Sequence, residues 1–344
     1  MVRSVRDRWK GMKKYKAYGI GAALVDTEIK VDDNDLNNMQ VEKGLMTLVD
    51  QARQQELLAH LEGHLVKASH ASGGSAGNSM IATAQFGGPT FMSCKVAQDA
   101  DGEIYISDLD AAGVDHCLNG DREVGTTGKC LVLITPDAER SMNTYLGISE
   151  SLGEDQLDAE AISASEYLYL EGYLVTSPSG RAAAVKAREI AEAQGVKTSL
   201  SFSDPGMVEF FRDGIAEMIG DRLDLIFCNR DEALGWAESN SIDEAVEALK
   251  KVANTFVITL GAEGALTFDG EELVEVPPHR VEAVDTNGAG DMFAGAFLYA
   301  ITRGEDFPTA GRFASLCAGK VVSKFGPRLP AADHATLKAE FFKN

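Results

Sequence analysis

The sequence predicts an α/β protein built on a mostly parallel sheet, and three observations lead to this prediction. From residue 156 onward, apolar stretches of strand length alternate with segments of helical length, which is the pattern of βαβ units. Near the amino terminus, residues 16–25 (KAYGIGAALV) form a short apolar run suited to a first buried strand. The chain has 344 residues, which is long enough for one large domain and a smaller one.

The expected elements follow from the places where apolar residues recur at strand or helix spacing. The segment from Glu28 to Leu65 is more polar than the rest of the chain, and we expect it to belong to a smaller domain. The expected strands cover residues 16–25, 90–95, 130–135, 167–170, 197–202, 223–228, 255–260 and 273–284. The expected helices cover residues 41–65, 80–86, 103–112, 156–164, 180–194, 206–218, 230–238, 242–251, 288–302, 308–323 and 334–342.

The composition argues against several classes of partner. A net charge of −21 is unfavourable for binding nucleic acid or an anionic membrane, so we expect neither. No window is apolar for long enough to span a bilayer, and the basic start of the chain lacks the apolar core of a secretory signal. We expect residues 1–15 to be a disordered extension. The five cysteines are scattered and form no CxxC pair, which is typical of reduced thiols in a cytoplasmic protein.

The stretch from Asp285 to Asp291 (DTNGAGD) is the clearest functional signal. Gly288, Ala289 and Gly290 come just before a small-residue apolar helix, where unpaired N–H groups and the helix dipole favour an anion. Asp291 would then lie beside that anion, where a carboxylate is useful as the base that takes a proton from an attacking hydroxyl. The pattern suggests phosphoryl transfer to an alcohol. The alternative is a glycine-rich helix start with an acidic residue in its first turn.

Residues 285–298 (DTNGAGDMFAGAFL) resemble the carboxy-terminal signature of the PfkB/ribokinase family of carbohydrate and nucleoside kinases. The resemblance implies a ribokinase-like three-layer sandwich, with a central, mostly parallel sheet and a small lid domain. The kinase domain is then expected over residues 16–330, with the lid built from about 27–72 and 120–145. It also implies that ATP and Mg²⁺ are used, and that Gly288, Ala289, Gly290 and Asp291 are catalytic.

Further strings match the family in the right order. Residues 72–79 (SGGSAGNS) are expected to form a loop, and they resemble the family's GGxxxN signature, which implies that Gly73, Gly74 and Asn78 bind the acceptor. Residues 229–232 (NRDE) match N-x-x-E, and residues 259–264 (TLGAEG) match T-x-G-x-x-G. These matches imply that ATP and Mg²⁺ are bound with the help of Asn229, Glu232, Thr259, Gly261 and Gly264. Ser315 is expected on a helix that flanks the adenine in relatives, and it is assigned to the ATP site as well.

Two assignments from the resemblance are less direct. The family's lid strands carry an arginine, so Arg140 is expected to touch phosphate when the lid closes, unless it is a solvated turn residue. In many relatives a monovalent cation such as K⁺ is bound by backbone carbonyls. The corresponding positions here are Asp285, Asn287, Ser323 and Gly326.

Adenosine kinases are the nearest members by their motifs, and they imply that Asp26 holds the ribose 2′ and 3′ hydroxyls. One position departs from that subfamily, because Ala22 stands where adenosine kinases typically have Asn. The acceptor is therefore left open between a nucleoside and a plain sugar, as in ribokinase, fructokinase or 2-keto-3-deoxygluconate kinase. An inactive ligand-binding homologue is the third alternative. The expected assembly is a monomer or a homodimer.

Overall fold

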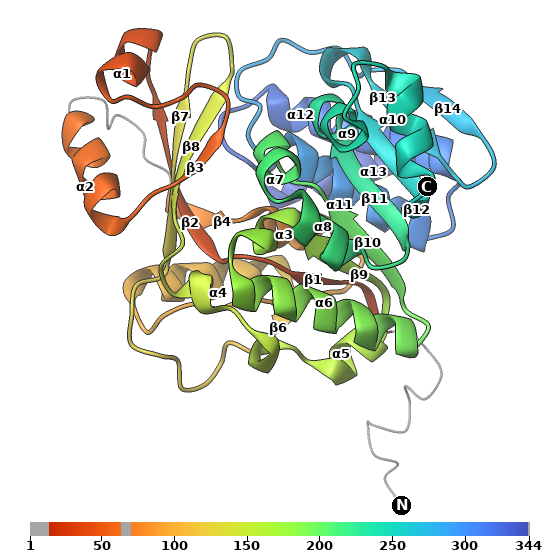
Figure 1. Ribbon diagram of the computed structural model, residues 1–344, viewed down its shortest axis with the longest axis horizontal. Coiled ribbons are helices and arrows are strands. Elements are labelled where there is room, and N and C mark those ends of the chain that lie inside the picture. The colour runs from red at the N-terminus through yellow and green to blue at the C-terminus, as the bar shows by residue number, and fades with distance from the viewer. Residues whose placement is uncertain (1–13, 63–69, 343–344) are drawn as a thin grey trace, which may run out of the picture.

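The computed structural model describes residues 14–62 and 70–342. It places a large sheet with helices on both faces beside a smaller sheet (Figure 1). The extension expected at residues 1–15 lies almost wholly outside the described residues, and Tyr15 already belongs to the first strand. No helix in the described ranges has the length and apolar character needed to cross a bilayer.

The large sheet has nine strands in the order β14-β13-β12-β11-β10-β9-β1-β5-β6. All neighbouring pairs are parallel except those of β13 with β12 and with β14. The strands are β1 (Tyr15–Ile20), β5 (Thr90–Ser93), β6 (Val114–His116), β9 (Ser165–Glu171), β10 (Lys197–Ser201), β11 (Leu223–Asn229), β12 (Ala253–Thr259), β13 (Ala265–Phe268) and β14 (Leu273–Val276). We call this sheet and its helices the core.

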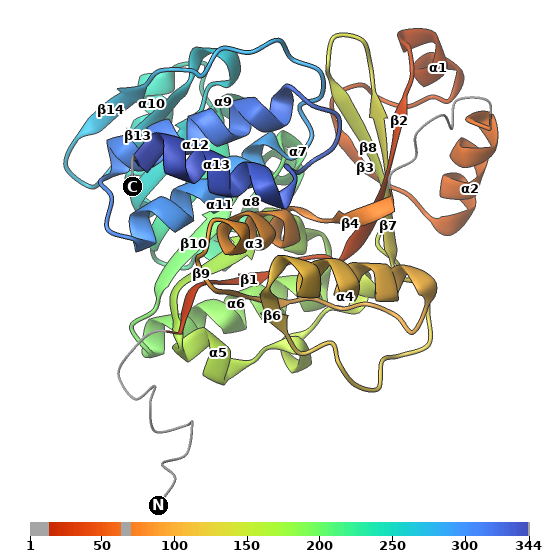
Figure 2. The same ribbon diagram turned by 180° about the vertical axis from the view of Figure 1, so that it is seen from behind.

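Helices cover both faces of the large sheet because its central strands are apolar on both sides. In β11, Leu225 and Phe227 pack into one hydrophobic cluster, whereas Ile226 and Cys228 pack into the other. The first cluster is covered by α3 (Ser75–Gln85), α4 (Ala100–Ala112), α11 (Ala289–Thr302), α12 (Phe307–Val322) and α13 (Ala331–Phe342). The second is covered by α5 (Ala159–Ser163), α6 (Pro178–Ala193), α7 (Pro205–Phe210), α8 (Arg212–Ile219), α9 (Arg230–Ala237) and α10 (Ile242–Leu249). This confirms the predicted three-layer sandwich (Figure 2).

The smaller sheet has five strands in the order β3-β8-β7-β2-β4. Its outer face is buried under two short helices, where Leu36 and Leu57 pack against Leu131 and Leu133. Its other face is turned toward the core. We call this sheet and its two helices the lid; its elements are β2 (Leu24–Lys30), α1 (Asp33–Asn38), β3 (Met46–Leu48), α2 (Gln51–His60), β4 (His70–Gly73), β7 (Gly128–Ile134) and β8 (Arg140–Tyr145).

Two predicted elements in the amino-terminal part were wrong. The run 16–25 is not one strand, because the chain leaves the core sheet after Ile20 and enters the lid sheet at Leu24. Both halves are buried, so their apolar character could not show the change of sheet. The end of the helix expected over 41–65, residues 63–65, lies outside the described residues. The rest of that range holds β3 and the shorter α2, which begins where the Asp50 side chain accepts a hydrogen bond from the backbone N–H of Arg53.

Three other boundaries also differ from the prediction. The loop expected over 72–79 is shorter than predicted: α3 begins at Ser75, so residues 75–79 are helical. The strand expected over 273–284 stops at Val276, since Pro277 and Pro278 follow and cannot donate to a ladder. The helix expected over 206–218 is divided into α7 and α8 at Phe211.

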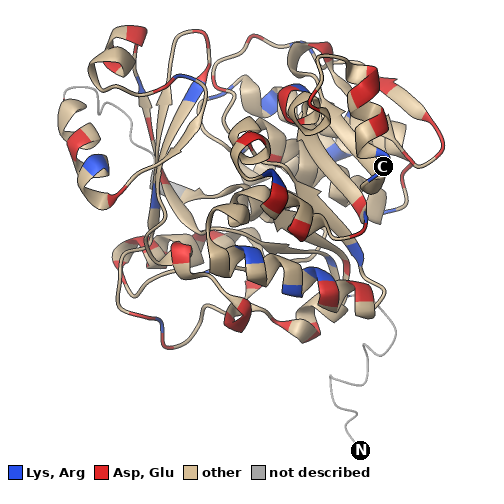
Figure 3. Ribbon diagram, in the orientation of Figure 1, with Lys and Arg blue, Asp and Glu red and all other residues tan. Residues whose placement is uncertain are grey.

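Acidic residues are spread over the exposed helices of both the core and the lid (Figure 3). The charged side chains therefore do not single out one face in this view. The groups that matter for function lie instead in the space between the core and the lid.

Candidate active site

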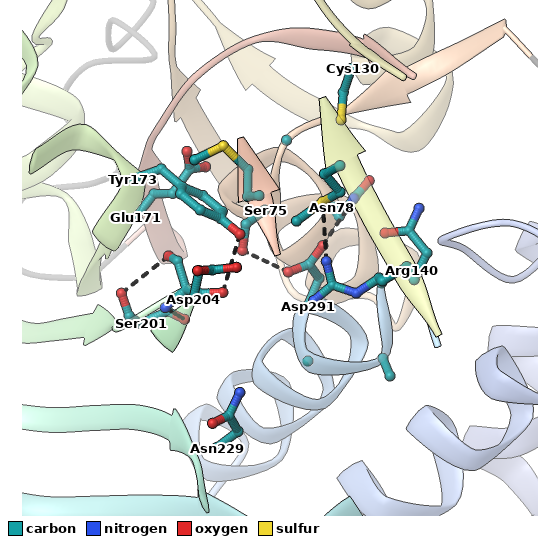
Figure 4. A pocket seen from close by; sticks show the side chains of 18 of the residues that line it. Ser75, Asn78, Cys130, Arg140, Glu171, Tyr173, Ser201, Asp204, Asn229 and Asp291 are labelled. Atoms are coloured by element: carbon teal, nitrogen blue, oxygen red, sulfur yellow. Dashed lines mark hydrogen bonds between the residues drawn. The ribbon is translucent and has the colours of Figure 1, made fainter. Parts of the chain in front are cut away.

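A cavity of about 360 Å³ lies between the lid and the carboxyl ends of the core strands (Figure 4). This is the edge of a parallel sheet at which α/β proteins bind ligands. The core contributes the start of α11, the start of α3 and the ends of β9, β10, β11 and β12. The lid contributes residues from β2, β3, β7 and β8.

The turn before α11 is built to leave backbone N–H groups free. Gly288 has a φ of +71°, and a Cβ added there would lie 2.1 Å from the carbonyl oxygen of Pro327. Only glycine fits this position. No side chain caps α11. The N–H of Ala289 donates to the carbonyl oxygen of Thr286 at 3.3 Å, so the N–H groups of Gly290 and Asp291 are left for another acceptor. These residues line the cavity, where an anion would complete the helix start.

Asp291 is the third residue of α11, and both of its carboxylate oxygens accept hydrogen bonds. The Ser75 hydroxyl donates to Oδ1 at 2.6 Å, and the Asn78 amide donates to Oδ2 at 2.9 Å. The Ser79 hydroxyl donates to the main-chain oxygen of Asp291 at 3.2 Å. Burial raises the pKa of Asp291, while the hydrogen bonds from Ser75 and Asn78 and the charge of Arg140 oppose that rise. The carboxylate is thus fixed beside the anion-binding turn.

The start of α3 brings Ser75 and Asn78 to this carboxylate. The preceding residue, Gly74, has a φ of +84°, and a Cβ there would lie 2.3 Å from the carbonyl oxygen of Ala22. The glycine therefore allows the chain to pass close to the turn between β1 and β2 before the helix begins.

Asp26 faces the cavity from β2 of the lid and is only 7% exposed. A Cβ on Gly73 would lie 2.0 Å from Asp26 Oδ1, so Gly73 leaves the space that the carboxylate occupies, although it does not line the cavity itself. Burial and the nearby Glu28 raise the pKa of Asp26 to about 8. Among the described residues, Asp26 Oδ1 and Asn78 Oδ1 are buried without a hydrogen-bond partner. These two oxygens can therefore accept hydrogen bonds from a bound ligand.

Asn229 and Glu232 lie at the end of β11 and the start of α9. The Glu232 carboxylate accepts hydrogen bonds from the Asn229 backbone N–H and side-chain amide, both at 2.8 Å. Burial raises the pKa of Glu232 to about 8. Both residues line the cavity, as does Thr259 at the end of β12.

The other residues expected near the nucleotide lie beyond the cavity. Gly261 and Gly264 have φ values of +58° and +100° and shape the turn that follows β12. Ser315 on α12 donates to the carbonyl oxygen of Pro277 and accepts from the backbone N–H of His279. It therefore holds the segment after β14.

Arg140 begins β8 and turns its guanidinium into the cavity (Figure 4). It is the lid's positive charge opposite the carboxylates of the core. Burial raises the pKa values of Asp204, Glu232 and Asp291, as well as that of Asp26 in the lid, and the charge of Arg140 opposes the rise in each. An anionic ligand would meet both Arg140 and the free amides of the α11 turn.

Comparison with known proteins identifies the family. The model of the pfkB family carbohydrate kinases matches residues 45–334. The chain belongs to the PfkB family of carbohydrate kinases.

Individual relatives agree with this assignment. A probable sugar kinase from Rhizobium etli CFN 42 is 32% identical, with a TM-score of 0.90 over 96% of this chain and 100% of its own. The adenosine kinase of Sinorhizobium meliloti is 35% identical, with a TM-score of 0.89 over 95% of this chain and 99% of its own. The adenosine kinase of Saccharomyces cerevisiae is 29% identical over 252 residues, which cover 69% of this chain and 72% of the yeast protein. The chain is therefore an enzyme, a sugar or nucleoside kinase.

The kinase brings most of the residues expected around a monovalent cation close together. The Asp285 carboxylate accepts hydrogen bonds from the backbone N–H groups of Asn287 and Gly326, at 2.8 and 2.9 Å. The backbone N–H of Asp285 bonds to the carbonyl oxygen of Val322, which precedes Ser323. The binding of K⁺ by the backbone carbonyls of Asp285, Asn287, Ser323 and Gly326 stays a prediction.

Sequence reasoning missed several cavity residues of this PfkB kinase. Ser75 stood in a recognised string but had no assigned role, and Glu171, Tyr173 and Asp204 were not considered. Glu171 is the last residue of β9, and Asp204 follows the end of β10. Their position at the carboxyl ends of predicted parallel strands was a signal that could have found them.

Proposed function

We propose that this kinase transfers the γ-phosphate of ATP directly to a primary hydroxyl of a nucleoside or sugar, with Asp291 as the base. The observation that supports this most strongly is the position of Asp291, which is held by Ser75 and Asn78 directly after the amides of the anion-binding turn. A hydroxyl placed beside this carboxylate would lose its proton as it attacks. The free amide of Gly290, at the positive end of α11, would stabilise the charge on the moving phosphate.

The acceptor would be held by its other hydroxyls. Asp26 Oδ1 and Asn78 Oδ1 lack partners among the described residues, and hydroxyl groups are suitable donors to both. A donor to Asp26 would also relieve the unfavourable burial of that carboxyl group. This arrangement suits a ligand with neighbouring hydroxyls, which ribose carries both as a free sugar and within a nucleoside.

A nucleoside is favoured over a free sugar by the apolar wall of the cavity. The lid lines the cavity with Leu24, Met46, Cys130 and Met142, none of which offers a strong hydrogen-bond partner. A free sugar carries hydroxyls around its ring and would leave this wall unused, whereas a flat base could pack against it. The adenosine kinases among the relatives agree with this preference. The sugar alternative is kept because of Ala22, which lines the same cavity.

Magnesium fits the oxygen-rich side of the cavity. Asp231 supplies a carboxylate there, beside Glu232, whose two oxygens accept hydrogen bonds from Asn229. Oxygen ligands are those that Mg²⁺ prefers. Among residues 14–62 and 70–342, no cluster of three or more acidic, histidine or cysteine residues forms a ready metal cage. Mg²⁺ is usually bound by one or two carboxylates together with substrate phosphates and water. When bound, it would neutralise charge on the nucleotide phosphates, with Asn229 and Glu232 ordering its surroundings.

The test is ADP release with MgATP against adenosine, inosine, guanosine, ribose, fructose and 2-keto-3-deoxygluconate, with and without K⁺. We expect the highest kcat/KM with adenosine and faster turnover with K⁺. Preference for a free sugar would overturn the nucleoside assignment and keep the reaction. No turnover on any acceptor, combined with calorimetric binding of ATP, would favour an inactive ligand-binding homologue.

A further inference from the structure

Helix α3 begins without a capping side chain of its own. Its N-cap is Gly74, which makes no side-chain hydrogen bond. A residue with a capping side chain cannot replace it, because a Cβ would lie 2.3 Å from the carbonyl oxygen of Ala22 and the φ is +84°. The first N–H groups of a helix need partners nevertheless. The cap of α3 must therefore come from elsewhere in the chain.

Glu171, at the end of β9, supplies that cap. Its side chain is buried, and its Oε2 accepts a hydrogen bond from the backbone N–H of Ala76 at 2.8 Å. Its Oε1 accepts one from the backbone N–H of Ala22 at 3.3 Å. Gly21 gives the carboxylate its space, because a Cβ there would lie 2.3 Å from Oε2. The partner of Ala76 is thus 95 residues away in the sequence.

The two groups that Glu171 holds belong to two different segments of the chain. Ala76 is in the first turn of α3, between Ser75 and Asn78, which together fix both oxygens of Asp291. Ala22 is in the short connection between β1 of the core and β2 of the lid. One carboxylate therefore links the helix that holds the base to the connection that leads to the lid.

We propose that Glu171 is a positioning residue, which caps α3 and thereby fixes Ser75 and Asn78 against Asp291. The proposal rests on the function proposed above, in which Asp291 is the base. A buried carboxylate costs stability unless its hydrogen bonds are satisfied. Glu171 is buried at a place where the start of α3 needs an acceptor and where the N-cap residue, Gly74, has no side chain to provide one.

The pKa of Glu171 is consistent with this role but does not establish it. Burial raises the pKa to about 7, while the hydrogen bonds from Ala76 and Ala22 work in the opposite direction. The backbone donors thus stabilise the ionised form, which is the form that caps best.

The first test is Glu171→Gln, with Glu166→Gln as the matched control. Gln keeps the size of the side chain but has only one acceptor oxygen for two N–H donors. We expect kcat to fall about 10- to 100-fold, because Asp291 is less well held, while the KM for ATP changes little. Glu166 lies on the same strand but pairs with Lys16 at 2.6 Å near the surface, so its variant should keep wild-type kcat.

The second measurement does not depend on activity. Hydrogen exchange of the Ala76 amide, followed by NMR, should be at least about tenfold faster in Glu171→Gln than in the wild type or in Glu166→Gln, because a single neutral oxygen must serve two N–H donors and holds each of them less well than a carboxylate does. Unchanged exchange would overturn the proposal even if the wild type transferred no phosphate. An inactive wild type would contradict the proposed function alone.

A further variant guards against a misfolded Glu171→Gln protein. Gly21→Ala keeps Glu171, but the added Cβ would lie 2.3 Å from its Oε2 and 2.7 Å from the Cβ of Ala76, so it should force the two partners apart, lower kcat and speed exchange at Ala76. A lower Tm combined with unchanged kcat in both variants would show that Glu171 is only structural, and would overturn the proposal.

Discussion

The core and the lid face each other across the cavity with different chemistry. The core contributes the anion-binding turn and the carboxylates of Glu171, Asp204, Glu232 and Asp291. The lid contributes the guanidinium of Arg140, the carboxylates of Asp26 and Glu139, and an apolar wall. In the proposed function, the core would carry the reacting groups, and the lid would carry acceptor recognition and a balancing positive charge.

The two parts are also joined at the reaction site itself. The Thr286 hydroxyl donates to the carbonyl oxygen of Ala138 in the lid at 3.0 Å. The Asn287 amide donates to Glu28 of β2 at 3.0 Å. Both donors belong to the turn that leads into α11. Lid position and the anion-binding turn are therefore coupled, which suits a site that excludes water once its substrates are bound.

The largest effect should come from the core. Asp291→Asn removes the base while keeping its size, and we expect kcat to fall by about 10²–10⁴-fold with a folded protein. Steady-state ADP release with the best acceptor would measure it. Asp213→Asn is the control, because Asp213 is an exposed residue in the first turn of α8. Near-normal turnover in Asp291→Asn would break the assignment of the chemistry to the core.

A smaller effect should come from the lid. Arg140→Ala removes its positive charge from the cavity, and we expect kcat/KM for ATP to fall about 10- to 100-fold, as for a lost charged hydrogen bond. Arg140 also lowers the pKa of Asp291, so the acid limb of the pH profile should move to higher pH. The pH dependence of kcat/KM would show both changes.

The lid control for that experiment is Lys43→Ala. Lys43 pairs with Asp33 and Asp137 on the outside of the lid, at 2.8 and 2.7 Å. It should leave kcat/KM unchanged. Equal losses in both variants would mean that the general charge of the lid matters, rather than the position of Arg140.

The last prediction concerns stability rather than turnover, and it tests the buried carboxyl group of Asp26 in the lid. Burial raises the pKa of Asp26 to about 8, so the folded state holds a proton that the unfolded chain has already lost above about pH 4. The free energy of unfolding should therefore fall as pH rises toward 8, by about 1.4 kcal/mol per pH unit for each such group. Urea unfolding of the ligand-free protein between pH 5 and 8 would measure this slope.

Asp26→Asn should make that slope shallower, because the variant has no proton to lose at this position. Asp137→Asn is the control, since hydrogen bonds from Lys43 and Thr135 lower the pKa of Asp137 to about 2, outside the range tested. An unchanged slope in Asp26→Asn would show that Asp26 titrates normally in the fold.

The sequence by itself determined the family, the fold class and the reaction type. Residues 285–291 are contiguous, and their glycines dictate a tight turn at a helix start, so the local backbone and its anion-binding character follow directly. Alternating strands and helices after residue 156 likewise predicted the parallel sheet, because each unit buries its apolar residues locally. The same reasoning predicted that Asn229 and Glu232 lie at the carboxyl end of a parallel strand, where α/β proteins bind ligands.

Only the tertiary structure decided how distant segments meet. An apolar run shows that residues are buried but not against which partner, which is why 16–25 was taken for one strand although it crosses from the core to the lid. The hydrogen bond between Glu171 and Ala76 joins residues 95 positions apart, and no local pattern encodes it. The apposition of Asp26 and Arg140 with Asp291 arises in the same way, because side chains from two sheets converge only after the chain has folded.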